Sequence, residues 1–540
     1  MRKERVCLNG EWDFMPVYGV KACLDLPQEI HYEEEKIRVP SSWRYVVPEG
    51  MPFCEEGFGI VDDFEPFNLF EYPREWSTAE TGVYRRKFSV QGRTSGERIS
   101  LQFDGIMQQS RIYLNGHSIA EWDEAYLPLT VDITKHLTEE GIENELMVVC
   151  TTFEEAQLAS GKIKTLGLIG SWFGYIGRGI WQDVHLVRTE ATFIADALIK
   201  TSVRNQHIEV ELEVNHLQDV AEKVVVLIDV LDECGTVLSF KPQTIVMDPN
   251  SKSSVKFEEQ WTNPKLWSFE SPFLFNMQIV LRANDKELDR KIIVFGFREI
   301  WTEQGQFILN GIRINLRGDS WHFQGAIQQT KEYAINWFKM CKEKGLNFVR
   351  LHAEPHPEYY LEAADEVGIL IVDETAIYGS GKSMDASHPV YIERCKKHVE
   401  RLVKRDRNHP SIIMWSLQNE MRWVDGRDTF KIHIPGMMKA IKRLDESRPV
   451  IVEGDNRLIS KQDTEIESYH YNIDGTIAQW DKVRPLVYGE HGGWWYICPQ
   501  NFSAYSGLDA YLSWENSSRG AALKEKLYVE VSRRNDPQFH

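Results

Sequence analysis

The chain has 540 residues, of which 42% are hydrophobic, 11% are aromatic and 26% are charged. At about 150 residues per domain, this length predicts three or four domains, and the composition excludes a disordered, fibrous or small disulfide-stapled protein. Asp and Glu number 81 against 62 Lys and Arg, so the net charge of −19 argues against nucleic acid or an anionic membrane as a partner.

Targeting and redox motifs are missing from the sequence. We find no apolar run with the length of a signal peptide or a membrane span. None of the eight cysteines forms a CxxC pair with another. We therefore expect a cytoplasmic protein with no membrane partner.

Residues 1–188 show short alternating runs that are interrupted by turn residues, which is typical of an antiparallel β-sandwich. In residues 99–103, the side chains of Ile99, Leu101 and Phe103 share one face of the expected strand, as a half-buried strand requires. We predict a jelly-roll-like sandwich for this first domain.

Residues 189–298 form a second β-rich block, with its clearest strands at residues 207–214 and 223–233. A block of about 110 residues with this pattern predicts an immunoglobulin-like sandwich.

From residue 299 to residue 540, strands alternate with helices, which predicts a parallel sheet closed into a (β/α)8 barrel. The expected helices span residues 330–344, 357–368 and 389–407. The expected strands span residues 313–318, 347–353, 369–375, 412–420, 450–455, 466–472 and 485–492.

The count of strands stops at seven, because the residues that follow them have a largely helical pattern. Either the barrel is completed irregularly, or the chain is a truncated version of a longer protein. We favour truncation before strand eight.

Two glutamates end strands that would lie across the barrel mouth from each other. Glu420 follows Asn419 at the end of strand four, and Glu490 ends strand seven. Barrel enzymes place their chemistry at these carboxyl ends, where burying a carboxylate is costly without a partner or a purpose. A salt-bridged or solvated glutamate is the alternative for either one alone. Together they suit glycoside hydrolysis, which uses one protonated acid and one ionised nucleophile.

At this point the sequence resembles glycoside hydrolase family 2, which contains β-galactosidases, β-glucuronidases and β-mannosidases. The resemblance covers essentially the whole chain and is most specific in RDRNHPSIIMWSLQNE at residues 405–420. Further matching segments are residues 8–14, 37–43, 82–88, 111–116, 179–186, 295–300 and 309–318. The resemblance implies that Glu420 is the acid/base, that Asn419 contacts the sugar 2-hydroxyl and that Glu490 is the nucleophile. It also implies a sugar-binding type of first domain.

Arg350 ends strand two where the family carries an arginine near the nucleophile, so we expect it to hold Glu490 ionised. Glu420 shows no obvious paired charge in the sequence and is expected to keep its proton. His352 resembles a family histidine that could bind a sugar hydroxyl. An ordinary ion pair for Arg350 and a supporting role for His352 are the alternatives.

Aromatic residues complete the expected substrate site. Strand six ends in Tyr469, His470 and Tyr471, and related barrels place a tyrosine against the nucleophile there. Only one of the two tyrosines can point into the mouth, and we choose Tyr469. Trp494 follows the nucleophile closely and is expected to stack on a pyranose ring, although many of the 17 tryptophans must be core residues.

The sequence departs from the family pattern at two positions next to the glutamates. Gln418 stands where the family usually has Gly, and His491 stands where it has an aromatic residue. Neither removes a carboxylate, but both bear on which sugar is accepted. The phosphate-binding, zinc-protease and serine-hydrolase motifs are absent from the sequence, so we predict no cofactor and no required metal.

The sequence thus predicts a retaining exo-β-glycosidase that acts on carbohydrate, with a β-galactosidase as the first choice of specificity. A β-glucuronidase or β-mannosidase specificity stays open, and so does a homo-oligomeric state. The alternative from another class is a non-catalytic carbohydrate-binding or scaffold protein.

Overall fold

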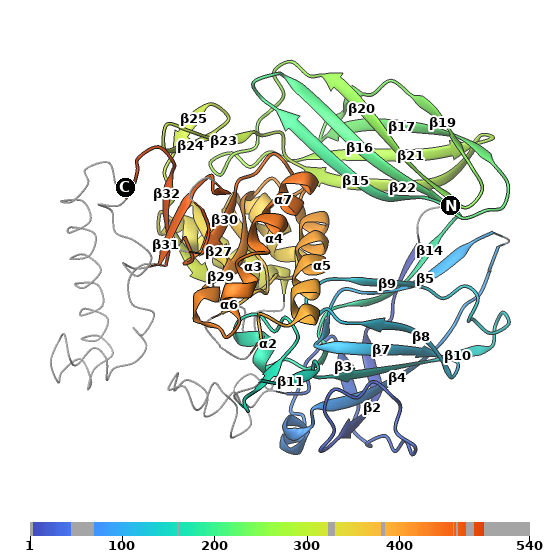
Figure 1. Ribbon diagram of the computed structural model, residues 1–540. Coiled ribbons are helices and arrows are strands. Elements are labelled where there is room, and N and C mark those ends of the chain that lie inside the picture. Colours follow the sequence, from blue (N-terminus) through green and yellow to red (C-terminus); the bar gives the residue numbers. More distant parts are fainter. Residues whose placement is uncertain are drawn as a thin grey trace.

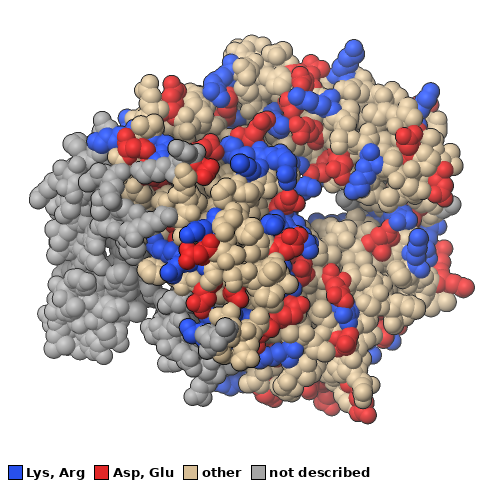
Figure 2. Space-filling view, viewed as in Figure 1, with Lys and Arg blue, Asp and Glu red and all other residues tan. Residues whose placement is uncertain are grey.

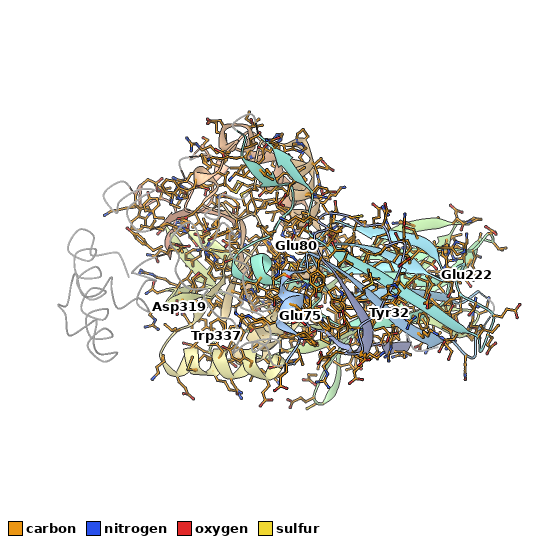
Figure 3. All side chains as sticks on the ribbon, turned by 90° about the horizontal axis from the view of Figure 1, so that it is seen from below. Tyr32, Glu75, Glu80, Glu222, Asp319 and Trp337 are labelled. Carbon is orange, nitrogen blue, oxygen red and sulfur yellow. The ribbon has the colours of Figure 1, made fainter. Side chains whose placement is uncertain are left out.

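The computed structural model describes residues 4–44, 70–94, 96–158, 161–321, 330–379, 384–456, 458–460, 463–470 and 480–490. Figure 1 shows a barrel of strands and helices flanked by two β-sandwiches, which both lie on the same side of it. The side chains in Figure 3 follow this division: Asp319 and Trp337 belong to the barrel, Tyr32 and Glu80 to the first sandwich, and Glu222 to the second. On the face shown in Figure 2, the acidic and basic side chains of the described residues are interspersed.

The first sandwich consists of two antiparallel sheets packed around one core. One sheet has the order β1 (Glu4–Cys7), β14 (Val184–Thr189), β5 (Arg98–Phe103) and β9 (Leu129–Asp132). The other has the order β3 (Ile37–Val39), β2 (Gly10–Val17), β4 (Thr81–Ser89), β10 (Glu143–Thr151), β7 (Gln109–Leu114) and β8 (His117–Trp122). Ile99, Leu101 and Phe103 are buried in that core, as the alternating pattern predicted.

The second sandwich follows with eight antiparallel strands. Its three-stranded sheet has the order β15 (Thr192–Ser202), β16 (His207–His216) and β20 (Ser251–Gln260). Its five-stranded sheet contains β17 (Glu222–Asp232), β18 (Gly235–Ser239), β19 (Gln243–Met247), β21 (Phe275–Ala283) and β22 (Lys286–Phe295). The strands alternate buried and exposed positions, and the buried aliphatic and aromatic side chains of both sheets form one cluster.

The barrel region begins with a small antiparallel sheet, β23 (Ile300–Glu303), β24 (Gln306–Leu309) and β25 (Ile312–Ile314). Our assignment of residues 313–318 to the first barrel strand is therefore wrong. The first parallel strand is β26 (Gly318–Trp321). The strand before it, β25, pairs antiparallel with β24 as a hairpin. A short apolar run followed by polar residues fits either kind of strand, which is why periodicity alone chose the wrong one.

The remaining barrel strands are parallel. β27 (Phe348–Leu351), β28 (Leu370–Glu374), β29 (Ile412–Asn419) and β30 (Val450–Glu453) continue the sheet from β26, and β31 (Glu467–His470) pairs with β32 (Leu486–Glu490). All eight residues of β29 are buried, as expected for a parallel strand covered on both faces. β27 to β32 confirm six of the seven predicted strands. The predicted truncation before strand eight concerns residues that the structure does not describe.

The predicted helices form as α3 (Lys331–Glu343), α4 (Glu358–Val367) and α5 (Pro389–Asp406), and α7 (Ile434–Leu444) precedes β30. In α5, Pro389 occupies the first turn and the His388 side chain accepts a hydrogen bond from Val390 N–H. The stripe that includes Cys395 and Leu402 is buried. Among the described helices, none is long and apolar enough to cross a membrane.

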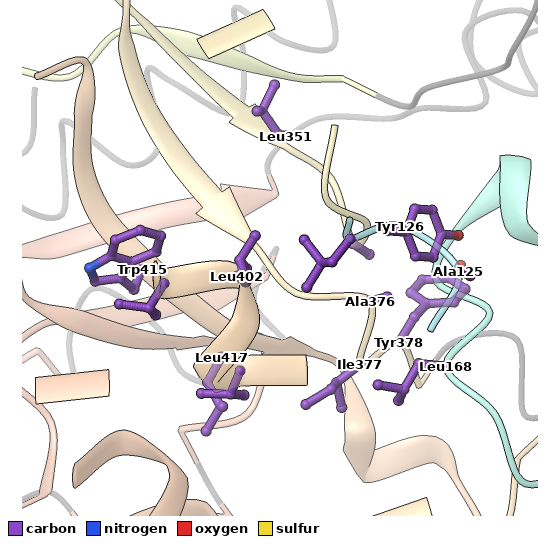
Figure 4. Packing of buried hydrophobic residues seen from close by; sticks show 14 of the residues in the cluster. Ala125, Tyr126, Leu168, Leu351, Ala376, Ile377, Tyr378, Leu402, Trp415 and Leu417 are labelled. Atoms are coloured by element: carbon purple, nitrogen blue, oxygen red, sulfur yellow. The ribbon is translucent and has the colours of Figure 1, made fainter. Parts of the chain in front are cut away.

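The first sandwich packs directly against the barrel. Ala125, Tyr126 and Leu168 of the sandwich belong to the same buried cluster as Ile377 and Tyr378 of the barrel, and Figure 4 shows them side by side. This contact brings the sandwich segment around α2 (Trp172–Ile176) close to the carboxyl end of β27.

Polar contacts cross the same boundary. Glu124 of the sandwich pairs with buried His398 of α5 at 2.8 Å, and Glu154 pairs with Arg394 at 2.7 Å. The sandwich and the barrel are therefore joined by apolar packing, by the buried contact between Glu124 and His398, and by an ion pair of Arg394 with the exposed Glu154.

Candidate active site

Glu420 and Glu490 come together at the carboxyl end of the barrel. One carboxylate oxygen of each, together with a ring nitrogen of His470, lie within 4.8 Å of one another. Retaining glycosidases hold their two carboxyl groups about 5–5.5 Å apart, whereas inverting enzymes need roughly 6.5–9.5 Å to admit a water. The spacing observed here belongs to the shorter class.

Glu490 is surrounded by cationic and donor groups. Its Oε1 lies 3.1 Å from Arg350 Nη1, 3.2 Å from His352 Nε2 and 3.7 Å from His470 Nδ1. Burial raises the pKa of this carboxyl, but His470, His352 and Arg350 together hold the pKa well below its ordinary value. Glu490 is thus ionised at neutral pH, as a nucleophile must be.

Arg350 of β27 is buried and contacts side chains from three other strands, β28, β29 and β32. Its guanidinium forms a two-pronged ion pair with Glu374 at 2.8 and 3.0 Å and donates to Asn419 Oδ1 at 2.7 Å. Burial lowers the pKa of Arg350, but Glu374, Glu453 and Glu490 outweigh it and raise the pKa. Arg350 lies where we expected it, against Glu490.

Asn419 takes its orientation from the same arginine. Because its Oδ1 accepts from Arg350, the amide plane is fixed beside the two glutamates. A contact with the sugar 2-hydroxyl stays a prediction.

Glu420 is not the unpaired carboxyl that we expected. Its Oε1 accepts from His470 Nδ1 at 2.9 Å and from Arg422 Nη2 at 3.1 Å. Arg422 comes from the short helix η4 (Met421–Trp423) that follows Glu420, and His470 ends β31. Neither contact was predicted, because sequence spacing does not show which way the side chains of Arg422 and His470 turn.

The departure at Gln418 supports the turn that carries Glu420. Glu420 has a left-handed backbone, with φ of 50°. Gln418 Oε1 accepts from Met421 N–H at 3.1 Å, and Glu420 N–H donates to Glu453 O at 3.0 Å. The longer side chain therefore braces the loop after β29.

His470 links the two glutamates to a third. Its Nε2 lies 3.2 Å from Glu453 Oε2, while its Nδ1 faces Glu420 and Glu490. Burial lowers the pKa of His470, but Glu490, Glu420 and Glu453 raise it to about 10 overall. The ring is an imidazolium at neutral pH and supplies the positive charge between the carboxylates.

Tyr469 is not brought into this cluster. Neighbouring residues of a strand point to opposite faces, and the face toward the glutamates is taken by His470. The Tyr469 hydroxyl instead donates to Glu467, and its ring meets Tyr488 edge-on. Our choice of Tyr469 is corrected accordingly. Tyr471 and Trp494 lie outside the described residues.

His352 does reach the site, with Nε2 on Glu490 and Nδ1 3.2 Å from Ser171 Oγ of the first sandwich. Its ring also packs edge-on against Tyr378.

Three residues of the cluster were missed from the sequence: Glu374, Glu453 and His470. The carboxyl-end rule that selected Glu420 and Glu490 applies equally to Glu374 and Glu453, which end β28 and β30. His470 was recognised as ending a strand but was passed over for its tyrosine neighbours.

Groups that resemble metal ligands occur twice in the part of the chain that is described. One is the cluster of Glu420, His470 and Glu490, in which both ring nitrogens of His470 face carboxylates. The other consists of Asp104, Asp183 and His185 on the first sandwich. The expectation that no metal is required stays a prediction.

Three family models match the chain. "Glycosyl hydrolases family 2, TIM barrel domain" matches residues 300–491, "Glycosyl hydrolase 2 galactose-binding domain-like" matches residues 59–166, and "Glycosyl hydrolases family 2" matches residues 192–298. They cover the barrel strands, the second sandwich and part of the first.

Among curated proteins, a β-galactosidase of Alteromonas mediterranea is 26% identical over 479 residues, which are 84% of this chain and 42% of that protein. The chain spans about half the length of the curated relatives it matches.

Among solved structures, a Bacteroides uniformis β-glucuronidase superposes with a TM-score of 0.72 and 20% identity, over 91% of this chain and 59% of that one. A β-galacturonidase from Eisenbergiella tayi, bound to galacturonate, superposes with a TM-score of 0.69 and 20% identity, over 95% of this chain and 88% of that one. At this identity, both likenesses support the fold alone.

Proposed function

The chain belongs to glycoside hydrolase family 2, and from this premise we propose that it is a retaining exo-β-glycosidase with Glu490 as nucleophile and Glu420 as acid/base. The observation that carries the proposal is the approach of the two carboxylates within 4.8 Å. That spacing is nearer to the 5–5.5 Å of retaining enzymes than to the roughly 6.5–9.5 Å that an inverting enzyme needs to admit a water.

The electrostatics support this division of the two roles. Glu490 is held ionised by Arg350, His352 and His470, so it attacks the anomeric carbon. The aglycone oxygen leaves with a proton from Glu420, and the sugar stays covalently bound to Glu490. In the second step, Glu420 takes a proton from water, which displaces Glu490 and releases the sugar.

His470 and Arg422 affect the protonation of Glu420, which must carry a proton in the first step. Both contact Glu420 Oε1, and a nearby cation favours the carboxylate form.

A terminal β-galactoside is the first substrate to test, because β-galactosidases recur among the relatives. A panel of nitrophenyl β-glycosides should include the galactoside, glucuronide, galacturonide and mannoside. We expect turnover of one member by the 540-residue chain, and a loss of at least about 10³-fold in kcat in Glu490→Gln. Glu343→Gln, on an exposed position of α3, is the matched control that keeps full activity.

Two results would count against this proposal. Equal activity in Glu490→Gln and the unaltered chain would remove Glu490 from the reaction. Sugar binding without turnover, unchanged in Glu420→Gln, would favour the carbohydrate-binding alternative.

A further inference from the structure

The first sandwich reaches the active site through the segment at residues 166–178. Leu168 and Ile169 of this segment are buried in the barrel cluster. Gly170 has φ of +64°, and a Cβ there would lie 2.6 Å from the Tyr126 hydroxyl and 3.0 Å from Ala353 O. Only glycine allows the two backbones to approach so closely.

Ser171 comes next and stands at the N-terminal cap of α2. Serine at this position commonly caps a helix with its side chain, but Ser171 makes no such bond. The side chain is fully buried, and its Oγ lies 3.2 Å from His352 Nδ1. Its hydroxyl is thus turned from the helix toward the barrel.

The second nitrogen of the same ring contacts the nucleophile. An ionised carboxylate can only accept, so the contact between His352 Nε2 and Glu490 requires a proton on Nε2. In a neutral imidazole the other nitrogen then has no proton and must accept. The Ser171 hydroxyl is placed to donate to it.

We propose that Ser171 is a positioning residue for the reaction, which donates to His352 Nδ1 and thereby fixes the ring tautomer that donates to Glu490. The galactose-binding-like sandwich thus supplies part of the active site. This inference rests on the proposed role of Glu490 and deepens it.

Loss of the hydroxyl has a definite chemical effect. Without a donor at Nδ1, the proton can move to that nitrogen, and the bare lone pair of Nε2 then faces the ionised Glu490. The nucleophile would lose a hydrogen bond and meet a repulsive contact. Ser171→Ala therefore affects chemistry rather than substrate binding, so kcat falls while KM changes little.

The tautomer can be measured without any substrate. Histidine ¹⁵N resonances of the 540-residue chain, assigned with His352→Gln, distinguish a protonated from a bare ring nitrogen. We expect the Nε2–H form of His352 in the unaltered chain and a mixture in Ser171→Ala. Ser110→Ala is the control, because it removes an equally buried hydroxyl from the same sandwich, one without a hydrogen-bond partner among the described residues. A doubly protonated ring, or an unchanged tautomer in Ser171→Ala, would overturn the proposal.

A double-mutant cycle tests the route through His352. We expect Ser171→Ala to lower the rate of inactivation by a 2-deoxy-2-fluoro glycoside about 10- to 150-fold, as the loss of one hydrogen bond to a charged centre predicts. In the His352→Gln background the same substitution should change the rate less than about twofold. Equal losses in both backgrounds would show that Ser171 acts by another path.

The two measurements separate this inference from the proposed function. If no glycoside reacts, the ¹⁵N measurement still decides the contact between Ser171 and His352. If Glu490 is labelled but the effects of Ser171→Ala and His352→Gln are additive, the glycosidase proposal is supported and the positioning role of Ser171 is contradicted.

Discussion

His470 shows how one side chain can decide the charge balance of a site. It contacts three carboxylates and is fully buried, so its charge is neither screened nor replaceable by solvent. An imidazolium beside Glu420 makes the catalytic proton easier to lose.

We therefore predict that His470→Gln, which keeps a donor of similar length but carries no charge, moves the alkaline limb of the kcat/KM profile to higher pH by about one unit or more. The measurement is the pH–rate profile with the best nitrophenyl substrate. An unchanged limb with a lower rate at every pH would mean that His470 only supports the fold.

Arg350 is the second residue whose charge the site cannot lose. Its guanidinium pairs with Glu374 and contacts Glu490 and Asn419. Lysine offers a single point of charge and cannot make the forked contact.

We predict that Arg350→Lys lowers kcat by at least about 10²-fold and destabilises the barrel, because Glu374 is left with an incomplete partner. Steady-state kinetics and thermal unfolding measure the two effects. A variant with unchanged kcat would contradict the role of Arg350 at Glu490.

At the scale of elements, the sandwich segment around α2 depends on glycines where it meets the barrel. A Cβ on Gly174 would lie 1.4 Å from Ile169 O and 2.3 Å from the Tyr126 hydroxyl. The backbone would have to move to admit it.

We predict that Gly174→Ala lowers the free energy of unfolding by about 1–3 kcal/mol and also reduces kcat, because Ser171 moves with the segment. Gly436→Ala is the control, since Gly436 lies in α7 with open space around it and alanine favours the helix. Equal stability of the two variants would argue against a tight fit at α2.

The elements were largely predictable from the sequence, whereas several contacts of the site were not. Apolar runs of the right length identified β27 to β32, because parallel strands buried on both faces leave a strong signal, and amphipathic patterns identified α3, α4 and α5 but not α7. The rule that chemistry lies at strand ends brought out Glu420, Glu490 and Arg350. The face of β31 and the pairing of residues 312–314 were missed, since both depend on which neighbour a short strand meets in space.

At the scale of the whole molecule, the joint between the first sandwich and the barrel contains a buried acid. Glu354 lies two residues beyond His352, and its Oε2 is 3.0 Å from the Tyr126 hydroxyl. That hydroxyl also lies 2.5 Å from Ile169 O. Burial raises the pKa of Glu354 to about 8, and it outweighs the hydrogen bonds from the Tyr126 hydroxyl and from backbone N–H groups of the α2 segment, which favour the carboxylate.

The sign of the resulting pH dependence follows by linkage. Between pH of about 4.5 and 8, the folded protein holds a proton on Glu354 that the unfolded chain releases, so stability falls as pH rises across this window. We predict that Glu354→Gln, which stays neutral, gains in melting temperature over the unaltered chain between pH 5 and pH 8. Parallel melting curves across this range would contradict a protonated Glu354.

The central claim is that Glu490 forms a covalent bond to the sugar, and the most direct measurement is mass spectrometry of the chain after reaction with 2-deoxy-2-fluoro glycosides of the sugars in the panel. We predict one sugar per chain, attached to the peptide that contains Glu490, and no label in Glu490→Gln. A label on another residue would contradict the account. So would hydrolysis that releases the inverted anomer first.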